Sequence, residues 1–153
     1  MEERMSLLRR STRLLLATAI LLIPGRSAEP DPKAVSYTLP DKLEWKKGDN
    51  NDTATVQGDP SKPGLYIQLL KWHPNKMSRP HFHSMERYIT VLSGTWWIGT
   101  GPKYDPASTY PAPAGTYVVD RANGIHYDGA KDTECLLEIV GMGPVTTTAA
   151  ESK

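Results

Sequence analysis

The chain has 153 residues, a length that suits a single domain. It carries 18 basic and 17 acidic residues for a net charge of +1, and this balance argues against a nucleic-acid partner. The 13 prolines and 12 glycines favour a β-rich domain with many turns over a helical one.

The N-terminus has the three-part layout of a secretory signal peptide. Residues 1–13 contain four arginines, and an apolar run follows over residues 14–23. This run is shorter than the roughly 20 residues of a transmembrane helix. We therefore predict a signal peptide over residues 1–27 and a mature domain over residues 28–153. The mature protein is expected in the periplasm or outside the cell, without a stable membrane anchor.

Three points about this segment stay open. Cleavage after Ser27 and cleavage after Ala28 both suit the small residues there. An uncleaved N-terminal anchor is the alternative to cleavage. Arg9 and Arg10 also offer a twin-arginine signal, whose route exports folded proteins, although the residues that follow fit that signal poorly.

The rest of the chain alternates short strand-like runs with turn residues. The run at 65–72 is apolar almost throughout and is expected to be a central strand with both faces covered. Hairpin turns are expected at 93–94 and at 128–132, and residues 144–153 are expected to be loose. After a leader strand or loose arm at 28–40, the predicted strands are 43–45, 53–56, 65–72, 88–92, 95–98, 116–119, 125–127 and 136–140.

Three side chains carry further expectations. Trp96 and Trp97 are adjacent in a strand and must face opposite sides, but the sequence does not say which one faces the interior. The one cysteine, Cys135, excludes an internal disulfide. Because it lies in a strand-like run, we interpret it as a small buried hydrophobic residue rather than a reactive thiol.

Two histidines stand two positions apart in a strand-like run that ends at Gly94. Side chains at i and i+2 share one face of a strand, so His81 and His83 are expected to face the same interior. Two imidazoles on one wall are half of a transition-metal site. His126 follows a later strand-like run. The fourth histidine, His73, is expected at the rim of a pocket.

These residues resemble the two sequence motifs of a small, single-domain, exported bacterial cupin. The first motif reads His-x-His, a few residues, a glutamate, six residues and a glycine, and His81, His83 and Gly94 match it. The second motif is a glycine, a hydrophobic strand, a turn and a histidine, and Gly115 to His126 match it loosely. The resemblance covers about residues 40–146.

The resemblance implies an all-β cupin jelly-roll barrel, also called a double-stranded β-helix. It implies a divalent transition metal on His81, His83 and His126, with iron, manganese, nickel, copper and zinc not distinguished. It also implies a homodimer.

One departure from the first motif concerns its metal-binding glutamate. Six residues separate Arg87 from Gly94, so Arg87 occupies the motif's glutamate position, and the carboxylate comes one position earlier, at Glu86. A slip of one residue turns a strand side chain to the other face. Glu86 therefore either stays outside the site or reaches it through a bulge as a fourth ligand. Arg87 either faces inward, favouring an anionic substrate, or pairs with a surface acid.

By resemblance, three-histidine cupins include iron dioxygenases that act on small molecules. We expect a metal-dependent dioxygenase for a small anionic or carbonyl substrate, with Arg87, Tyr88 and Tyr127 as substrate-binding residues. A metal-dependent isomerase or lyase and a non-catalytic module that binds a small ligand or a metal are the alternatives.

Overall fold

The computed structural model describes residues 29–151. Contacts divide the chain into an N-terminal unit that ends at Ser36 and a second unit that begins at Tyr37. The described part of the first unit forms one turn, in which the amides of Ala34 and Val35 donate to the carbonyl of Asp31. The predicted signal peptide lies outside the described residues. Within residues 29–151, no helical segment has the length and apolar character needed to span a membrane.

The second unit is nearly all antiparallel β-structure, as the sequence predicts. Two short 3-10 turns, η1 (Pro40–Lys42) and η2 (Pro106–Ser108), accompany the strands. In chain order, the described strands are β1 (Asn51–Gln57), β2 (Gly64–Trp72), β3 (Lys76–Met77), β4 (His81–His83), β5 (Arg87–Ser93), β6 (Thr95–Thr100), β7 (Tyr110–Pro113), β8 (Tyr117–Asp120), β9 (His126–Ala130), β10 (Cys135–Gly143) and β11 (Thr147–Ala149).

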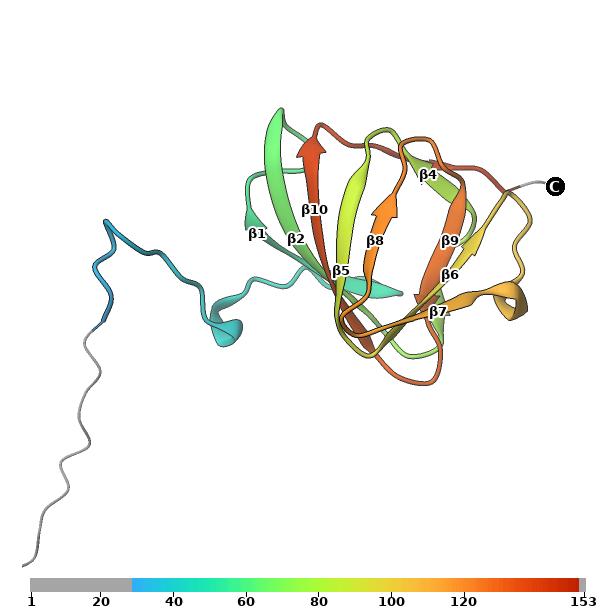
Figure 1. Cartoon of the computed structure of the whole chain (residues 1–153), viewed down its shortest axis with the longest axis horizontal. Helices are drawn as coiled ribbons and strands as arrows, with labels where there is room; N and C mark the ends of the chain where they lie inside the picture. The colour runs from blue at the N-terminus through green and yellow to red at the C-terminus, as the bar shows by residue number, and fades with distance from the viewer. Residues whose placement is uncertain (1–28, 152–153) are drawn as a thin grey trace, which may run out of the picture. The chain divides into compact units, whose positions relative to one another are not determined.

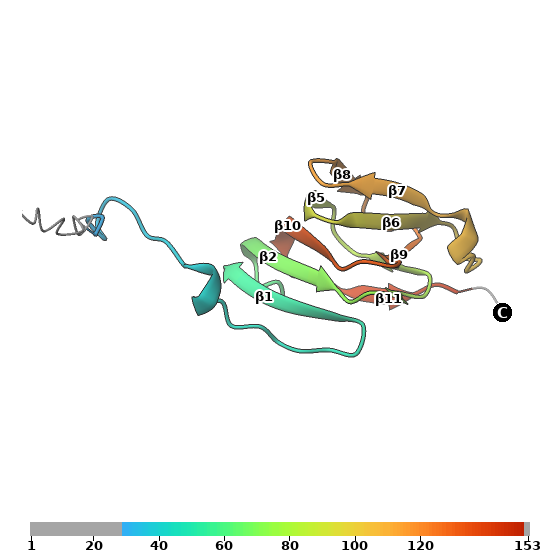
Figure 2. The same cartoon turned by 90° about the horizontal axis from the view of Figure 1, so that it is seen from below.

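The strands form two sheets that pack face to face (Figure 1). One sheet has five strands in the order β1-β2-β10-β5-β8. The other has the order β11-β4-β9-β6-β7, and β3 pairs with β9 beside it. Figure 2 shows the layers from a second direction, with β1, β2 and β10 apart from β6 and β7. This jelly-roll arrangement encloses one interior between the sheets.

The core between the sheets follows the two-residue period of the strands. In β10, Cys135, Leu137 and Ile139 are buried, and in β5 the buried residues are Ile89 and Val91. Arg87 precedes Ile89 by two positions, so its side chain is directed to the same interior face. In β5 the alternation thus places one charged residue on the same face as the buried apolar residues Ile89 and Val91.

Two predicted hairpins are wrong, because the chain changes sheets at both turns. β5 belongs to the five-stranded sheet, whereas β6 belongs to the other. Gly94 makes the connection with φ +73°, and a Cβ there would lie 2.2 Å from the carbonyl oxygen of Glu134. In the second case, Asp128 and Gly129 belong to β9, so the turn before β10 comes later in the chain.

Three further expectations need correction. Residues 43–45 form no strand. The chain next to them pairs with β1 only through a single bridge between Lys46 and Thr53. β2 is central, but its outer face is not fully covered, since Leu65 is 51% exposed. The tail is not uniformly loose, because β11 pairs with β4.

The two adjacent tryptophans separate as expected. Trp96 is buried between the sheets, whereas Trp97 lies on the outer face with the Lys131 ammonium 3.7 Å from its ring centroid. The structure thus decides the orientation that the sequence left open.

We predict that Cys135 resists thiol reagents in the folded protein. The residue is fully buried, and this burial raises the pKa of its thiol to about 12, so the reactive thiolate is scarce at pH 8. Titration with a chromogenic disulfide reagent should find almost no reaction in buffer and one rapidly reacting thiol in guanidinium chloride. Prompt reaction of the native protein would contradict this placement.

Candidate metal centre

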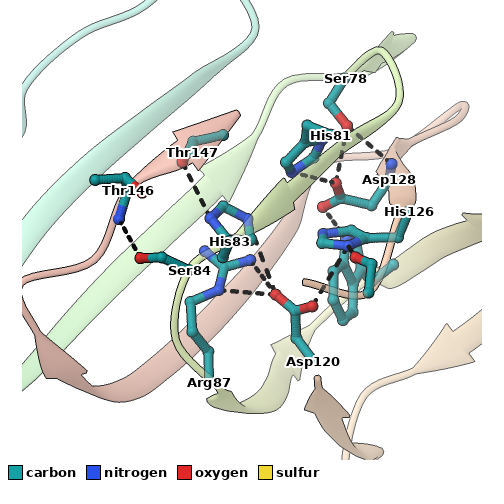
Figure 3. A network of polar contacts seen from close by, with 12 residues as sticks. Ser78, His81, His83, Ser84, Arg87, Asp120, His126, Asp128, Thr146 and Thr147 are labelled. Atoms are coloured by element: carbon teal, nitrogen blue, oxygen red, sulfur yellow. Dashed lines mark hydrogen bonds and ion pairs between the residues drawn. The ribbon is translucent and has the colours of Figure 1, made fainter. Parts of the chain in front are cut away.

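Strand pairing in the six-stranded sheet brings the three histidines together (Figure 3). His81 in β4 stands opposite His126 in β9, and His83 stands opposite Thr147 in β11. One nitrogen of each imidazole lies within 4.8 Å of the corresponding nitrogens of the other two. Histidines separated by more than forty positions in the chain therefore form one group, which is the geometry the sequence predicts.

Hydrogen bonds from Nδ1 orient the three rings. Nδ1 of His81 lies 2.9 Å from the backbone carbonyl oxygen two residues earlier, and Nδ1 of His126 lies 3.0 Å from the corresponding carbonyl oxygen before it. A carbonyl only accepts, so Nδ1 carries the proton in both rings and Nε2 keeps its lone pair. Nδ1 of His83 lies 3.0 Å from the hydroxyl of Thr147. Such outer hydrogen bonds fix the tautomer of histidines that bind metals.

The Nε2 atoms of the group lack the partners that buried nitrogens normally have. Nε2 of His83 and Nε2 of His126 are buried without a hydrogen-bond partner. An unsatisfied buried polar atom costs about 1–3 kcal/mol, so a group that accepts these lone pairs fits the site. Burial lowers the pKa of His81, and burial together with Arg87 lowers the pKa of His83 to about 2. Both rings are therefore neutral at pH 7, the form that binds a metal.

A buried ion pair reaches the histidines from the other sheet. Arg87 in β5 stands opposite Asp120 in β8, and its Nε and Nη2 donate to Oδ2 of Asp120 at 2.8 and 2.6 Å. The same carboxylate places Oδ1 at 3.4 Å from Nδ1 of His126 and Oδ2 at 3.9 Å from Nε2 of His83. Arg87 thus faces inward and pairs with an acid that is itself buried.

A second buried carboxylate, Asp128, lies on the other side of the group. It accepts hydrogen bonds from Nε1 of Trp96 at 2.8 Å and from the hydroxyl of Ser78 at 2.9 Å. Its Oδ1 lies 3.9 Å from Nε2 of His81. Neither carboxylate is among the site residues predicted from the sequence. Asp128 lies two positions after His126, so in a strand both side chains share one face. This spacing could have identified Asp128 as a neighbour of the histidines.

A cavity of about 450 Å³ opens beside the group. His81, His83 and Asp128 of the six-stranded sheet line it, and Arg87, Leu137 and further apolar residues of the five-stranded sheet line it as well. We call this space the polar cavity. It offers a ligand a cationic guanidinium next to the imidazoles of His81 and His83.

The structure places Glu86 outside the histidine group and corrects its assignment as a possible fourth ligand. Its carboxylate accepts from Nη1 of Arg121 at 2.8 Å and from the hydroxyl of Tyr88 at 2.9 Å. The physical reason is strand alternation, since Glu86 and Arg87 point to opposite faces. Tyr88 shares the outer face and is 42% exposed, so it does not border the polar cavity as a substrate-binding residue.

Tyr127 also lies away from the histidines, because it alternates with His126 in β9. Its hydroxyl donates to the carbonyl of Asp105 at 3.0 Å, and its ring packs against Tyr104. A Cβ at position 99 would collide with this ring, so Gly99 makes room for it. Tyr127 therefore has a structural contact and not the expected substrate contact. His73 is also apart, with Nε2 3.0 Å from Asp52.

Comparison with known proteins supports the fold and not a particular activity. No protein-family model matches the sequence, and no curated protein matches it. Among solved structures, the polyketide cyclase RemF from Streptomyces resistomycificus is 15% identical with a TM-score of 0.66, covering 78% of this chain and 87% of the cyclase. A sugar phosphate isomerase of the cupin superfamily from Silicibacter pomeroyi is 15% identical with a TM-score of 0.58, covering 73% and 80%.

A third similar structure is an uncharacterised protein with a double-stranded β-helix domain from Klebsiella pneumoniae. It is 15% identical with a TM-score of 0.59, and the match covers 77% of this chain and 99% of that protein. Identities this low establish the shared architecture alone.

We predict that each of the three histidines is needed for metal binding. Alanine at His81, His83 or His126 should weaken Zn²⁺ or Ni²⁺ affinity by at least about 100-fold. Loss of a residue that only hydrogen-bonds to a metal ligand typically weakens affinity by about 10- to 100-fold, and loss of the ligand itself should have a larger effect. Isothermal titration of metal-free protein provides the measurement. His73→Ala and Glu86→Gln are matched controls and should keep the parent affinity. Equal losses of metal affinity in the two control variants would contradict the assignment of the three histidines as metal ligands.

Proposed function

This chain folds as a small cupin domain, and we propose that it is a metal-dependent oxygenase for a small anionic or carbonyl compound. His81, His83 and His126 would hold a divalent transition metal through Nε2. The observation that carries this proposal is the buried, partnerless Nε2 of His83, which borders the polar cavity, and of His126 in the same histidine group. When bound, such a metal supplies a Lewis acid with open positions for substrate and dioxygen.

The charges around the group support a ligand with one negative charge. A divalent ion and Arg87 bring three positive charges, and the carboxylates of Asp120 and Asp128 bring two negative ones. One positive charge remains in a buried environment, where an uncompensated charge is costly. A monoanion therefore completes the balance better than a dianion or a cation.

The chain's own residues have distinct roles in this proposal. Arg87 lines the polar cavity and presents its guanidinium to the anionic end of the ligand. Asp120 fixes the position of that guanidinium through two hydrogen bonds. Leu137 and Ile139 line the same cavity and give part of its wall an apolar surface. Together these residues would bind and orient the ligand.

The same site also suits a metal-dependent isomerase or lyase, our second candidate. The observation in its favour is the fold shared with a protein described as a sugar phosphate isomerase. This activity does not consume dioxygen, which separates it from the oxygenase.

Dioxygen consumption decides between these functions. Fe²⁺-loaded protein should consume dioxygen in the presence of a member of a panel of diketones, catechols and thiols. Conversion of a panel member without dioxygen uptake would overturn the oxygenase in favour of the isomerase or lyase. Saturable binding without conversion would indicate a non-catalytic binding module.

We predict that Arg87→Gln weakens the binding of an anionic panel member by about 10- to 100-fold, since a charge-assisted hydrogen bond contributes about 1.5–3 kcal/mol. An uncharged analogue should lose much less affinity. Titration of the metal-loaded protein gives both values. Lys131→Gln, on the outer face over Trp97, is the matched control. Equal losses for both ligands in Arg87→Gln would show that this residue does not recognise charge.

We also propose that the mature domain works in the periplasm or outside the cell. The charged start, apolar run and small residues over residues 1–27 support this location. Cys135 is compatible with it, because a single buried thiol forms no internal disulfide in an oxidising compartment.

A homodimer through the outer face of the five-stranded sheet is part of the same proposal. Large apolar side chains are exposed on this face in β2, β5, β8 and β10, which is unusual for a surface open to water. Register places them on one side of the sheet. They are Leu65, Tyr88, Leu92, Tyr117 and Met142.

We predict that Met142→Lys converts this dimer to monomer. Met142 stands opposite Leu65 in the neighbouring strand, so a lysine there places a charge within the apolar face. Sedimentation velocity at micromolar concentration gives the mass. Tyr110→Lys is the control, because Tyr110 is 81% exposed in β7 of the other sheet. A monomeric parent protein would contradict the proposed interface.

A further inference from the structure

A second cavity, of about 240 Å³, borders the histidine group and takes no part in the function proposed above. It lies between β6, β8 and the residues that connect β8 to β9. We call it the apolar cavity, because hydrophobic side chains form most of its wall. The residues that matter for its chemistry are Trp96, Ile98, Val118, Asp120, Ile125 and His126.

The histidine group stands where the two cavities meet. His81 and His83 line the polar cavity, whereas His126 lines the apolar cavity. Their imidazole nitrogens are nevertheless within 4.8 Å of one another. Trp96 borders both cavities, and its indole is held by the hydrogen bond to Asp128. A ligand bound at the histidines therefore has space on two sides, and the two spaces differ in polarity.

The wall of the apolar cavity limits the charge of an occupant. Two charged residues line it, Asp120 and Arg121, and both are already paired, Asp120 with Arg87 and Arg121 with Glu86. An anion would be repelled by the carboxylate. A cation would lose its hydration against Ile98, Val118 and Ile125 without gaining a free counter-charge. An uncharged apolar group is the occupant that these walls favour.

The volume limits the size of that group. Apolar cavities of about 150 Å³ are large enough to bind benzene. A cavity of about 240 Å³ accordingly accepts a single six-membered ring or a short branched alkyl chain.

We propose that the apolar cavity binds an uncharged ring or branched alkyl group, and that this group belongs to the molecule whose anionic end binds beside Arg87. The second half of this inference rests on the proposed function. Together the cavities define the ligand class as small acids with one negative charge and one apolar substituent. The polar cavity receives the anionic end, and the apolar cavity receives the substituent.

Binding of fluorobenzene to the metal-free protein tests the first half without any activity. Fluorine NMR should show saturable binding. Val118→Phe, which fills the cavity, should weaken it at least about tenfold, a change of about 1.4 kcal/mol. Leu70→Phe, which narrows the polar cavity instead, is the matched control and should bind fluorobenzene like the parent. Thermal melting checks that both variants fold, and Ile98→Phe replaces Val118→Phe if that variant does not.

A pair of acids tests the second half on the Zn²⁺-loaded protein. Phenylacetate should bind more tightly than acetate, and Val118→Phe should remove that difference while leaving acetate unchanged. Arg87→Gln should weaken both acids. Absence of fluorobenzene binding, or an unaltered preference for phenylacetate in Val118→Phe, would overturn the inference. If the parent protein does not bind Zn²⁺, the proposed function would be overturned instead, and the fluorobenzene result would still stand.

Discussion

The buried ion pair between Arg87 and Asp120 is the interaction on which the centre depends. It joins two neighbouring strands of the five-stranded sheet, and its carboxylate reaches within 3.4 Å of His126 in the other sheet. The geometry of the histidines is therefore tied to both layers of the fold. Removing one partner of such a pair leaves a buried charge alone, which costs about 3–5 kcal/mol. The pair also keeps a guanidinium at the edge of the polar cavity without leaving its charge uncompensated.

The surroundings of the histidines combine two kinds of environment. Hydrogen bonds from Nδ1 to backbone carbonyls keep Nε2 of His81 and His126 available, Nδ1 of His83 contacts the hydroxyl of Thr147, and burial keeps His83 neutral. Polar groups lie towards one cavity and apolar groups towards the other. Asp120 contributes to both, because it pairs with a residue of the polar cavity and forms part of the wall of the apolar one. The proposed selectivity for a molecule with two unlike ends rests on this division.

Local periodicity predicted the parts of the site that lie within one strand. The spacing of His81 and His83 gave their common face, and the resemblance to cupin motifs joined them to His126. The same period turns Tyr88 to the other face of its strand from Arg87, and Tyr127 to the other face from His126. If Arg87 and His126 face the interior, neither tyrosine can contact a substrate there.

Contacts between distant strands cannot be predicted from local sequence patterns. Asp120 becomes a partner of Arg87 only through the register of β5 and β8, and Thr147 meets His83 only because the tail forms β11. Asp128 was assigned to a hairpin turn because Asp-Gly is a common turn pair, whereas tertiary pairing keeps it in β9.

The pairing of β11 with β4 has a consequence for the order of assembly. The hydroxyl that contacts His83 belongs to Thr147, which lies 64 positions further along the chain. During synthesis, this contact is missing until that later segment has been added. Topologies dominated by such distant partners have high contact order and reach the native state in about milliseconds to seconds. The contact that orients His83 therefore forms only once β11 has paired with β4, which makes it a late step of folding.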